Sequence, residues 1–309
     1  MPRVSVIIPT YNRSELLVKA VSSVLGQSFG DFELLVIDDC SPDDTQAKIE
    51  GIGDSRVAYF RNPENKGVSG SRNFGIERSR GEFIAFLDDD DEWLPEKLER
   101  QVGILDNGPS NLGLVYTGSL SVDLATGSLI ETTIPRYKGK VLNDLAVLNF
   151  IPTSSVLVRR ECFTKIGLFD ENLSYGEDFD LWIRISTEFL IDYIQDPLLI
   201  HKDHPQTTTA NNKNVAVNVG RILDKHSALF ASNKKGLSNY LLMMGTAYCY
   251  DGDLSEGRKA IARAIKAQPL DLRLYYNLAL TLIGPGMYRN IKRLKYNLIQ
   301  TVQNYIGRS

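Results

Sequence analysis

The run Phe86-Leu87-Asp88-Asp89-Asp90-Asp91-Glu92-Trp93 places four aspartates directly after a strongly apolar segment. Carboxylates at this density repel one another, so they need either full solvation or a neutralising cation. Residues 81–87 read as a buried strand, and residues 94–98 open a helix with Pro95 near its first turn. The acidic run therefore follows the carboxyl end of a strand, where open α/β sheets bind ligands. We expect a divalent-metal site for a phosphorylated substrate there, rather than a solvated acidic turn.

The composition is typical of a globular protein with about two domains. Of its 309 residues, 43% are hydrophobic, which is ample for a core. Cys40, Cys162 and Cys249 are far apart and odd in number, which favours a reducing compartment over a disulfide framework. The first apolar run is cut off by Pro9, too early for a signal peptide, and no run approaches the roughly 20 apolar residues that span a bilayer. These features predict a cytoplasmic protein.

Charge divides the chain into two parts. Residues 1–205 carry 20 basic and 33 acidic side chains, a balance of −13, whereas residues 206–309 carry 15 basic and 5 acidic ones, a balance of +10. The change falls near the polar stretch of residues 206–212. We therefore expect two domains, 1–210 and 211–309.

The first part alternates strands and helices. Its apolar runs predict strands, its amphipathic runs predict helices, and from about residue 112 the pattern turns antiparallel, with a hairpin of 120–122 and 129–133. This order predicts an α/β fold, a three-layer α/β/α domain with a mixed, mostly parallel sheet. The expected strands are 3–8, 32–37, 56–61, 82–87 and 114–117, and the expected helices are 14–25, 43–50 and 69–80.

After residue 210 strand signals disappear, and the sequence predicts a small all-helical domain. Breaks at Gly236, residues 251–253, Pro269 and residues 284–286 separate the helical runs. Residues 241–269 resemble one tetratricopeptide-type helical hairpin. The expected helices are 216–230, 238–250, 255–267, 272–283 and 288–305.

Two strand ends offer groups that suit a nucleotide. Pro9 ends the first strand, and Thr10, Tyr11, Asn12 and Arg13 follow it, so that the Tyr11 ring is placed to stack on a base. The second strand ends in Asp38-Asp39. One of these carboxylates can cap the next helix, which leaves the other to accept an N–H of uracil or guanine. We assign Asp39 to the base and Asp38 to a structural role.

Two further segments carry candidate catalytic groups. Residues 65–73 combine Lys66, two glycines including Gly67, and Arg72 at the start of a helix, which is a ready site for a diphosphate or else an ordinary turn. Glu177 and Asp178 begin a later helix, where the helix dipole favours acids. One of the two is a candidate general base.

In their order, these stretches resemble the family 2 glycosyltransferases of the GT-A fold over about residues 3–206. The resemblance implies transfer of a sugar from a nucleotide-sugar donor, preferably a UDP-sugar, to an acceptor hydroxyl with inversion. Its metal would be Mn²⁺ or Mg²⁺. The blocks that carry it are Val4–Arg13, Ile37–Ser41, Asn65–Asn73, Phe86–Asp91 and Gly176–Trp182.

The resemblance also implies roles for single residues. Thr10, Tyr11, Arg13 and Asp39 would hold the base and ribose, and Asp178 would be the catalytic base, with Glu177 beside it. Asp88-Asp89-Asp90 would match the family's Asp-any-Asp motif, with Asp90 as metal ligand and Asp88 toward ribose or metal. In the alternative alignment the motif is shifted by one residue, onto Asp89 and Asp91. The family often has a histidine over the diphosphate near the position of His204.

The partners follow from these assignments. We expect a carbohydrate or lipid-linked acceptor and no nucleic acid. Residues 287–299, with four basic and no acidic side chains, are either an interfacial helix at the inner face of a membrane or a helix packed on the bundle. Two other functions stay open: a nucleotidyltransferase, and an inactive nucleotide-sugar-binding module that recruits a partner.

Overall fold

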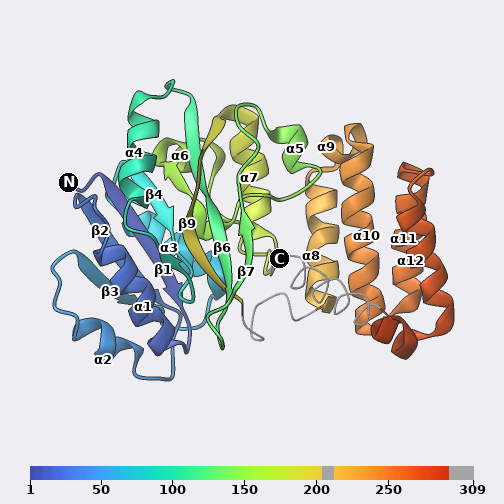
Figure 1. Ribbon diagram of the computed structural model, residues 1–309, viewed down its shortest axis with the longest axis horizontal. Coiled ribbons are helices and arrows are strands. Elements are labelled where there is room, and N and C mark those ends of the chain that lie inside the picture. Colours follow the sequence, from blue (N-terminus) through green and yellow to red (C-terminus); the bar gives the residue numbers. More distant parts are fainter. Residues whose placement is uncertain (204–211, 292–309) are drawn as a thin grey trace, which may run out of the picture. The chain divides into compact units, whose positions relative to one another are not determined.

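The structure is a computed structural model that describes residues 1–203 and 212–291. The chain divides into two compact units. One consists of Met1–Leu145 with Asn149–Thr207, and the other consists of Ala146–Leu148 with Thr208–Ser309. In Figure 1 the first unit runs from blue to yellow and the helices of the second from orange to red.

Within the described residues, the first unit is built on one nine-stranded sheet. Its spatial order is β3-β2-β1-β4-β8-β6-β9-β5, and β7 pairs with β6. The strands are β1 (Val4–Thr10), β2 (Phe32–Asp38), β3 (Val57–Arg61), β4 (Phe83–Phe86), β5 (Glu92–Trp93), β6 (Leu112–Asp123), β7 (Leu129–Thr133), β8 (Leu157–Arg159) and β9 (Leu190–Asp203).

The centre of the sheet is parallel. β1 is buried along its whole length and pairs in parallel with β2 and with β4, and β2 pairs in parallel with β3. β8 enters antiparallel to β4 and β6, and the predicted β6–β7 hairpin is present. The predicted mixed sheet is therefore confirmed.

Pro9 does not end the first strand, contrary to expectation. It lies within β1, paired in register with Ile37, and the strand continues to Thr10. The pairing of β1 with β4 stops at Ile7. Pro9 therefore lies where β1 has only β2 as a neighbour, and its missing N–H removes no ladder bond to β4.

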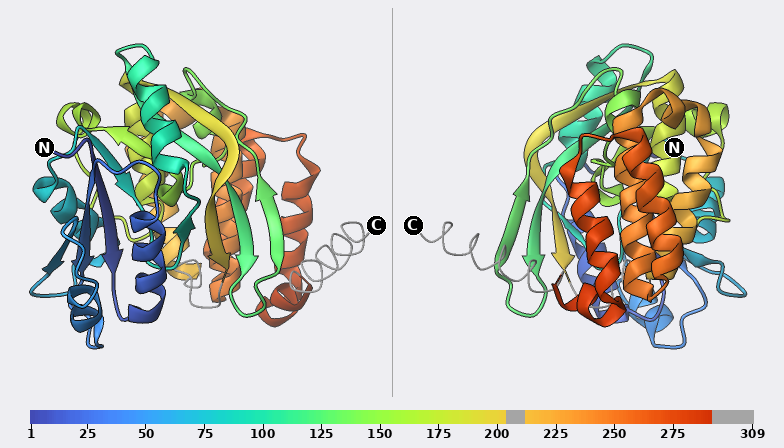
Figure 2. Two further views of the ribbon diagram at one scale, coloured as in Figure 1. Left: turned by 60° about the vertical axis from the view of Figure 1, so that its left-hand side comes forward. Right: turned by 90° about the vertical axis from the view of Figure 1, so that its right-hand side faces the viewer.

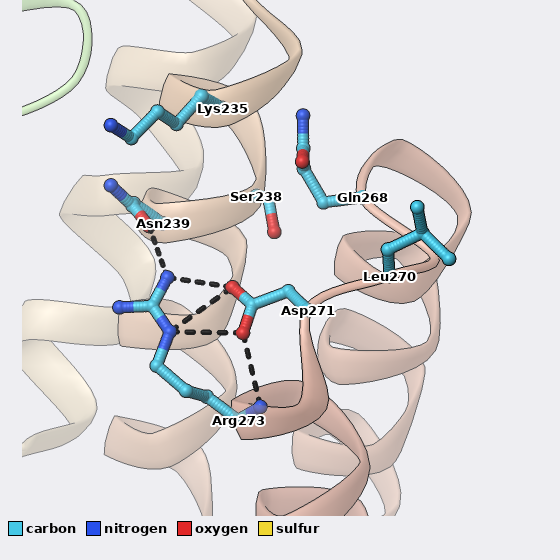
Figure 3. Close-up of a pocket in the computed structure, with 7 residues that line it drawn as sticks. All are labelled: Lys235, Ser238, Asn239, Gln268, Leu270, Asp271 and Arg273. Carbon is cyan, nitrogen blue, oxygen red and sulfur yellow. Dashed lines mark hydrogen bonds and ion pairs between the residues drawn. The ribbon is translucent and has the colours of Figure 1, made fainter.

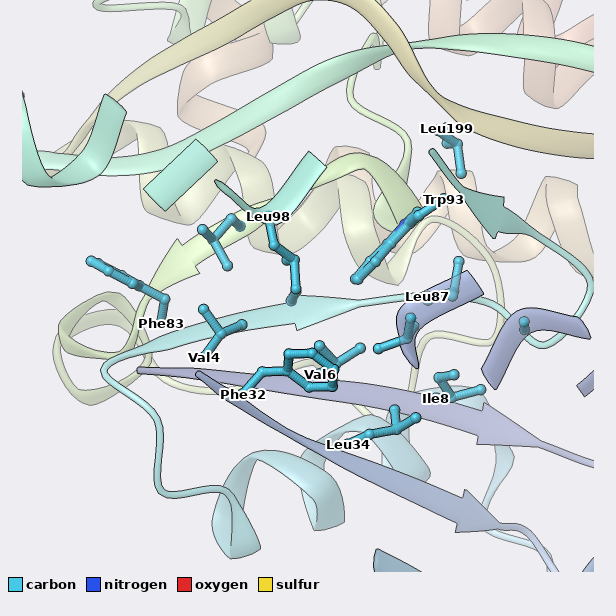
Figure 4. Close-up of a cluster of buried hydrophobic side chains, with 14 of the residues drawn as sticks. Val4, Val6, Ile8, Phe32, Leu34, Phe83, Leu87, Trp93, Leu98 and Leu199 are labelled. Carbon is cyan, nitrogen blue, oxygen red and sulfur yellow. The ribbon is translucent and has the colours of Figure 1, made fainter. Parts of the chain in front are cut away.

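Helices cover both faces of this sheet. On one face Val4, Val6 and Ile8 of β1 pack in a buried apolar cluster with side chains of α1 and α4 (Figure 4). On the other face α3 contacts β1 and β2. This is the predicted three-layer arrangement. The helices of the unit are α1 (Ser14–Leu25), α2 (Thr45–Glu50), α3 (Gly67–Arg78), α4 (Lys97–Asn107), α5 (Leu142–Leu145), α6 (Arg160–Ile166) and α7 (Glu177–Glu188).

The second unit is helical throughout its described residues. Figure 2 shows α10, α11 and α12 in its right-hand panel. Gly245 and Gly257 let α10 and α11 approach closely, since a Cβ on either would lie about 3 Å from the other's carbonyl oxygen. The expected helix 216–230 is two helices that meet at His226. The helices are α8 (Asn212–Lys225), α9 (Ser227–Ser232), α10 (Lys234–Asp251), α11 (Leu254–Ala267) and α12 (Leu272–Leu280).

The expected membrane contact falls at the end of this unit. Only residues 287–291 of the basic segment are described, and residues 292–299 lie outside the described residues. Across residues 1–203 and 212–291, no helix has both the length and the apolar character that crossing a bilayer requires.

Gly75 fixes how close α3 lies to the sheet, and this closeness can be tested. A Cβ at Gly75 would lie 2.6 Å from Cγ2 of Ile7, so Gly75→Ala must push α3 away from β1. We expect it to lower the free energy of unfolding by about 1–3 kcal/mol, measured by urea denaturation.

Gly103→Ala in α4 is the matched control. Gly103 is exposed, and a Cβ there would meet no atom within 4 Å. The greater helix propensity of alanine should then raise stability by up to about 1 kcal/mol. Equal effects of the two substitutions would show that α3 does not depend on close packing at Gly75.

Candidate functional site

The candidate site lies at the carboxyl edge of the parallel strands. β1 lies between β2 and β4, so the crossover from β1 to β2 and the crossover from β3 to β4 run in opposite directions across the sheet (Figure 1). Open α/β sheets bind ligands in the crevice at such a point. This edge carries Thr10 and Asp38, which are paired in register, and the aspartates that follow β4.

Two loops at this edge have strained backbone. In the described parts of the chain, Asn12 (φ 55°) and Cys40 (φ 68°) are the non-glycine residues with positive φ. Such conformations cost of order 1–3 kcal/mol each and persist only where the surroundings impose them. The Asn12 N–H donates to Ser41 Oγ at 2.9 Å, so the loop after β1 is held by the loop after β2.

Arg13 compensates the middle of the aspartate run. Its Nη1 lies 3.2 Å from Asp89 Oδ1 and 2.8 Å from Asp90 Oδ2. The Thr10 hydroxyl donates to Asp89 Oδ2 at 2.7 Å. Burial raises the pKa of Asp89 to about 6, although Arg13 and Thr10 act in the opposite direction. Thr10 and Arg13, which the resemblance assigned to the nucleotide, thus hold the acidic run in this structure.

Asp91 is compensated by a histidine from a distant strand. The pairing of β5 with β9 brings His201 to Asp91, where Nδ1 lies 2.9 Å from Oδ1. The bond to Asp91 raises the pKa of His201 to about 9, so the imidazole is a cation at neutral pH. The sequence did not reveal this pair, because β5 is too short to be recognised. His204, the expected metal ligand, lies outside the described residues.

Arg72 joins the aspartate run to the helix that carries the candidate base. It is 3% exposed, with Nη2 2.7 Å from Asp88 Oδ1 and Nη1 2.7 Å from Glu177 Oε1. Burial alone would lower the pKa of Arg72, but the charges of Asp88 and Glu177 raise it. The guanidinium also lies 5.4 Å from the ring centre of Phe169. Arg72, expected at a diphosphate, therefore connects α3, the strand end and α7.

Asp178 is held by uncharged groups. Its Oδ2 accepts from Asn149 Nδ2 at 3.2 Å and from Thr153 Oγ1 at 3.3 Å, and its Oδ1 accepts the Phe179 N–H at 2.6 Å. Burial, with a smaller contribution from the charge of Glu177, raises the pKa of Asp178 to about 6. A carboxylate with that pKa can take a proton near neutral pH. No local pattern in the sequence marked Asn149 or Thr153.

The two carboxylates after β2 are both engaged by the protein. Asp38 accepts from Arg61 Nη1 at 3.1 Å and from the Tyr59 hydroxyl, as its structural assignment implies. Asp39 accepts the N–H groups of Lys66 at 2.9 Å and Gly67 at 2.8 Å. Asp39 therefore binds the amino end of α3, whereas the sequence suggested that its carboxylate was free for a base.

The other candidates differ in access. Tyr11 is 48% exposed in the loop after β1. Pro9 is buried in the sheet, and Lys66 and Gly67 are exposed at the start of α3. The structure thus leaves Tyr11, Lys66 and Gly67 accessible to a ligand at this edge.

The donor chemistry at the strand end suits a hard divalent cation. Carboxylate oxygens are the ligands that Mg²⁺ and Mn²⁺ prefer, and such ions are commonly held by one or two carboxylates plus substrate phosphates. Asp88 and Asp90 are partly exposed, whereas Asp89 and Asp91 are buried. No group of three or more His, Cys, Asp or Glu side chains suited to a metal is assembled in the described residues.

Comparisons with known proteins point to one enzyme family. Residues 5–167 match the family model described as Glycosyl transferase family 2. An uncharacterized glycosyltransferase of Rickettsia typhi is 30% identical over 260 residues, which are 82% of this chain and 79% of the relative. The GalNAc(5)-diNAcBac-PP-undecaprenol beta-1,3-glucosyltransferase of Campylobacter jejuni is 28% identical over 283 residues, 89% of this chain and 83% of that protein.

Solved structures share the fold at lower identity. S. aureus TarS in complex with UDP-GlcNAc has a TM-score of 0.64 at 18% identity, covering 96% of this chain and 92% of that one. The mannosyltransferase PcManGT of Pyrobaculum calidifontis, with GDP-Man and Mn²⁺, has a TM-score of 0.62 at 19% identity, covering 100% of this chain and 88% of that one. With the family match over more than half of its length, the chain belongs to glycosyltransferase family 2.

Proposed function

We propose that this glycosyltransferase is metal-dependent and inverting. It moves a sugar from a UDP-sugar to the hydroxyl of a carbohydrate or lipid-linked acceptor. Membership of the family establishes a glycosyltransferase, and the names of the relatives support a nucleotide-sugar donor and a lipid-linked acceptor. The metal, the donor base and the stereochemistry belong to the proposal.

The observation that carries the proposal is the environment of Asp178. A single inversion needs one base on the acceptor side, positioned to take the proton of the attacking hydroxyl. Asp178 has a raised pKa of about 6 and is held by Asn149 and Thr153. Its neighbour Glu177 is joined through Arg72 to Asp88 at the strand end. A pair of 2.7 Å contacts thus connects the residue next to the candidate base to the candidate diphosphate site.

The surplus of acid at the strand end favours a metal. Asp88 and Asp90 would meet the diphosphate, which is itself an anion, so a cation is needed between them. A divalent ion held by Asp88 and Asp90 would neutralise charge that develops on the leaving diphosphate. Arginines contact Asp88 and Asp90 as well, but these two side chains are partly exposed, whereas Asp89 and Asp91 are buried and so less suited to this role.

The donor and acceptor assignments rest on relatives of stated activity. TarS is solved with UDP-GlcNAc, and PcManGT with GDP-Man, so a uracil or a guanine base fits this fold. We favour UDP because the Escherichia coli relative that is 31% identical over 214 residues is named UDP-Glc:alpha-D-GlcNAc-diphosphoundecaprenol beta-1,3-glucosyltransferase WfgD. The relative from Campylobacter jejuni is named for an undecaprenol-linked substrate, which supports a lipid-linked acceptor.

A donor screen tests the function as a whole. The full chain would be incubated with UDP- and GDP-sugars in the presence of Mn²⁺, and release of the nucleoside diphosphate would be measured. We expect UDP from at least one UDP-sugar. Pyrophosphate as the product would instead indicate a nucleotidyltransferase, and failure of every donor to bind or react would indicate an inactive module.

Asp178→Asn tests the base. We expect kcat to fall by about 10²–10⁴-fold with little change in UDP affinity, because the amide cannot accept the proton. In the wild type, log(kcat/KM) should fall by one for each pH unit below about 6, where Asp178 becomes protonated. Steady-state kinetics between pH 5 and 8 would measure both effects. An Asp178→Asn enzyme with unchanged kcat would remove Asp178 from this role.

The stability of Asp178→Asn separates lost chemistry from lost folding. The pKa of Asp178 is about 4 in the unfolded chain and about 6 in the folded protein. Ionisation of Asp178 therefore lowers the free energy of unfolding as the pH rises from about 4 to about 6. This cost is fully present above pH 6 and is absent in the amide. At pH 8 the variant should therefore melt at least as high as the wild type.

The metal register is tested by comparing two aspartates. We expect Asp90→Asn to raise the Mn²⁺ concentration for half-maximal activity by at least about tenfold, because a ligand is lost. Asp91→Asn should mainly lower the melting temperature, because it breaks the ion pair with His201. The reverse pattern, a Mn²⁺ defect in Asp91→Asn alone, would place the metal on the alternative register.

A further inference from the structure

The helical unit contains a polar cavity of about 240 Å³. It lies between α10 and the turn that joins α11 to α12. Lys235, Ser238 and Asn239 of α10 line one wall, and Gln268, Asp271 and Arg273 line the other (Figure 3). These residues are remote in sequence from the glycosyltransferase motifs, which end before residue 206.

Ser238 gives the first indication of a ligand. The side chain is 1% exposed, and its Oγ is buried without a hydrogen-bond partner among the described residues. A helical serine can satisfy its hydroxyl by bonding to the carbonyl one turn earlier, but Ser238 does not. Leaving a buried hydroxyl unpaired costs free energy, so native proteins rarely do so. Ser238 is among the residues that line the cavity, so rotation about its Cα–Cβ bond would bring the hydroxyl to a bound acceptor group.

Cationic groups give the second indication. Lys235 and Asn239 are one turn apart on α10, and Figure 3 shows both reaching to the same side as the guanidinium of Arg273. Lys235 has no ion-pair partner in the described residues. In Arg273, Nε bonds to Asp271, and Nη2 bonds to Asp271 and Asn239. Among the described residues, Nη1 has no hydrogen-bond partner.

Asp271 does not cancel this positive charge. Its Oδ2 lies 2.6 Å from Arg273 Nη2, and its Oδ1 accepts the Arg273 N–H at 3.0 Å as the cap of α12. Asp271 therefore neutralises and orients Arg273, and Lys235 leaves the cavity with one net positive charge. A fixed guanidinium edge, an ammonium and a hydroxyl donor together suit an anionic oxygen group.

We propose that this cavity binds a small oxyanion, the phosphate or carboxylate group of a ligand, through Lys235, Ser238 and Arg273. The volume is about eight times the roughly 30 Å³ that a water molecule occupies in the liquid, so one such group enters with some of the ligand attached. The bound oxygens accept from Ser238 Oγ, Lys235 Nζ and Arg273 Nη1. None of these three residues belongs to the candidate transfer site.

Inorganic phosphate is the first probe, with Lys235→Gln as the test variant and Lys234→Gln as its matched control. Both lysines lie in the first turn of α10, but Lys234 does not line the cavity. The melting temperature of the full chain would be followed against phosphate at constant ionic strength without metal. We expect the apparent Kd for phosphate to weaken about tenfold in Lys235→Gln, equivalent to about 1.4 kcal/mol, and to stay unchanged in Lys234→Gln. Equal responses of all three proteins would overturn the proposal.

Ser238→Ala separates binding from folding. Removing an unpaired buried hydroxyl should leave the melting temperature without phosphate unchanged or higher, while phosphate binding weakens several-fold. A lower melting temperature with unaltered phosphate binding would mean that Ser238 is only structural, against the proposal. Acetate replaces phosphate in a parallel series. A Lys235-dependent response to one anion identifies the group bound, a response to both supports an oxyanion site, and a response to neither overturns it.

Discussion

The site depends on one buried cation. Arg72 is 3% exposed and bridges Asp88 at the end of β4 and Glu177 at the start of α7. Removing one partner of a buried ion pair typically costs about 3–5 kcal/mol, because the remaining charge is left uncompensated. The Asp88 side chain is 37% exposed, so water screens that contact and the bond to Glu177, which is 13% exposed, is the stronger constraint. The position of α7 is therefore coupled to that of α3, and the candidate base moves with both.

Charge at the strand end is compensated only in part. The carboxyl groups of Asp88–Asp91, Glu177 and Asp178 contact or adjoin the cations Arg13, Arg72 and His201, which leaves three acids more than bases. Burial raises the pKa values of Asp89 and Asp178 only to about 6, so both carboxyls stay mostly ionised at neutral pH and the surplus remains. A diphosphate would add further negative charge. The edge therefore receives such a ligand only with additional positive charge, which is the physical reason for proposing a divalent ion.

The fold could be predicted from the sequence because its signals are local. Apolar periodicity placed α1 at Ser14–Leu25, and the apolar runs placed β1 and β2 to within two residues. The site was less predictable, because its contacts join residues far apart. Asp39 binds Lys66 and Gly67 across 27 and 28 residues, and His201 meets Asp91 across 110. No spacing rule links such positions, so the acidic run was recognised while the groups that hold each aspartate were not.

The environments of Glu177 and Asp178 explain how two adjacent acids would have different roles, Glu177 as a counter-ion and Asp178 as the base. Both begin α7, where the helix dipole favours negative charge. Glu177 has a permanent cation at 2.7 Å and is therefore fixed as its counter-ion. Asp178 is bonded to the amide of Asn149 and the hydroxyl of Thr153, which carry no charge, and burial raises its pKa. An ionised Asp178 is then a stronger base than an exposed aspartate, and under the proposed mechanism this is the property that the reaction needs.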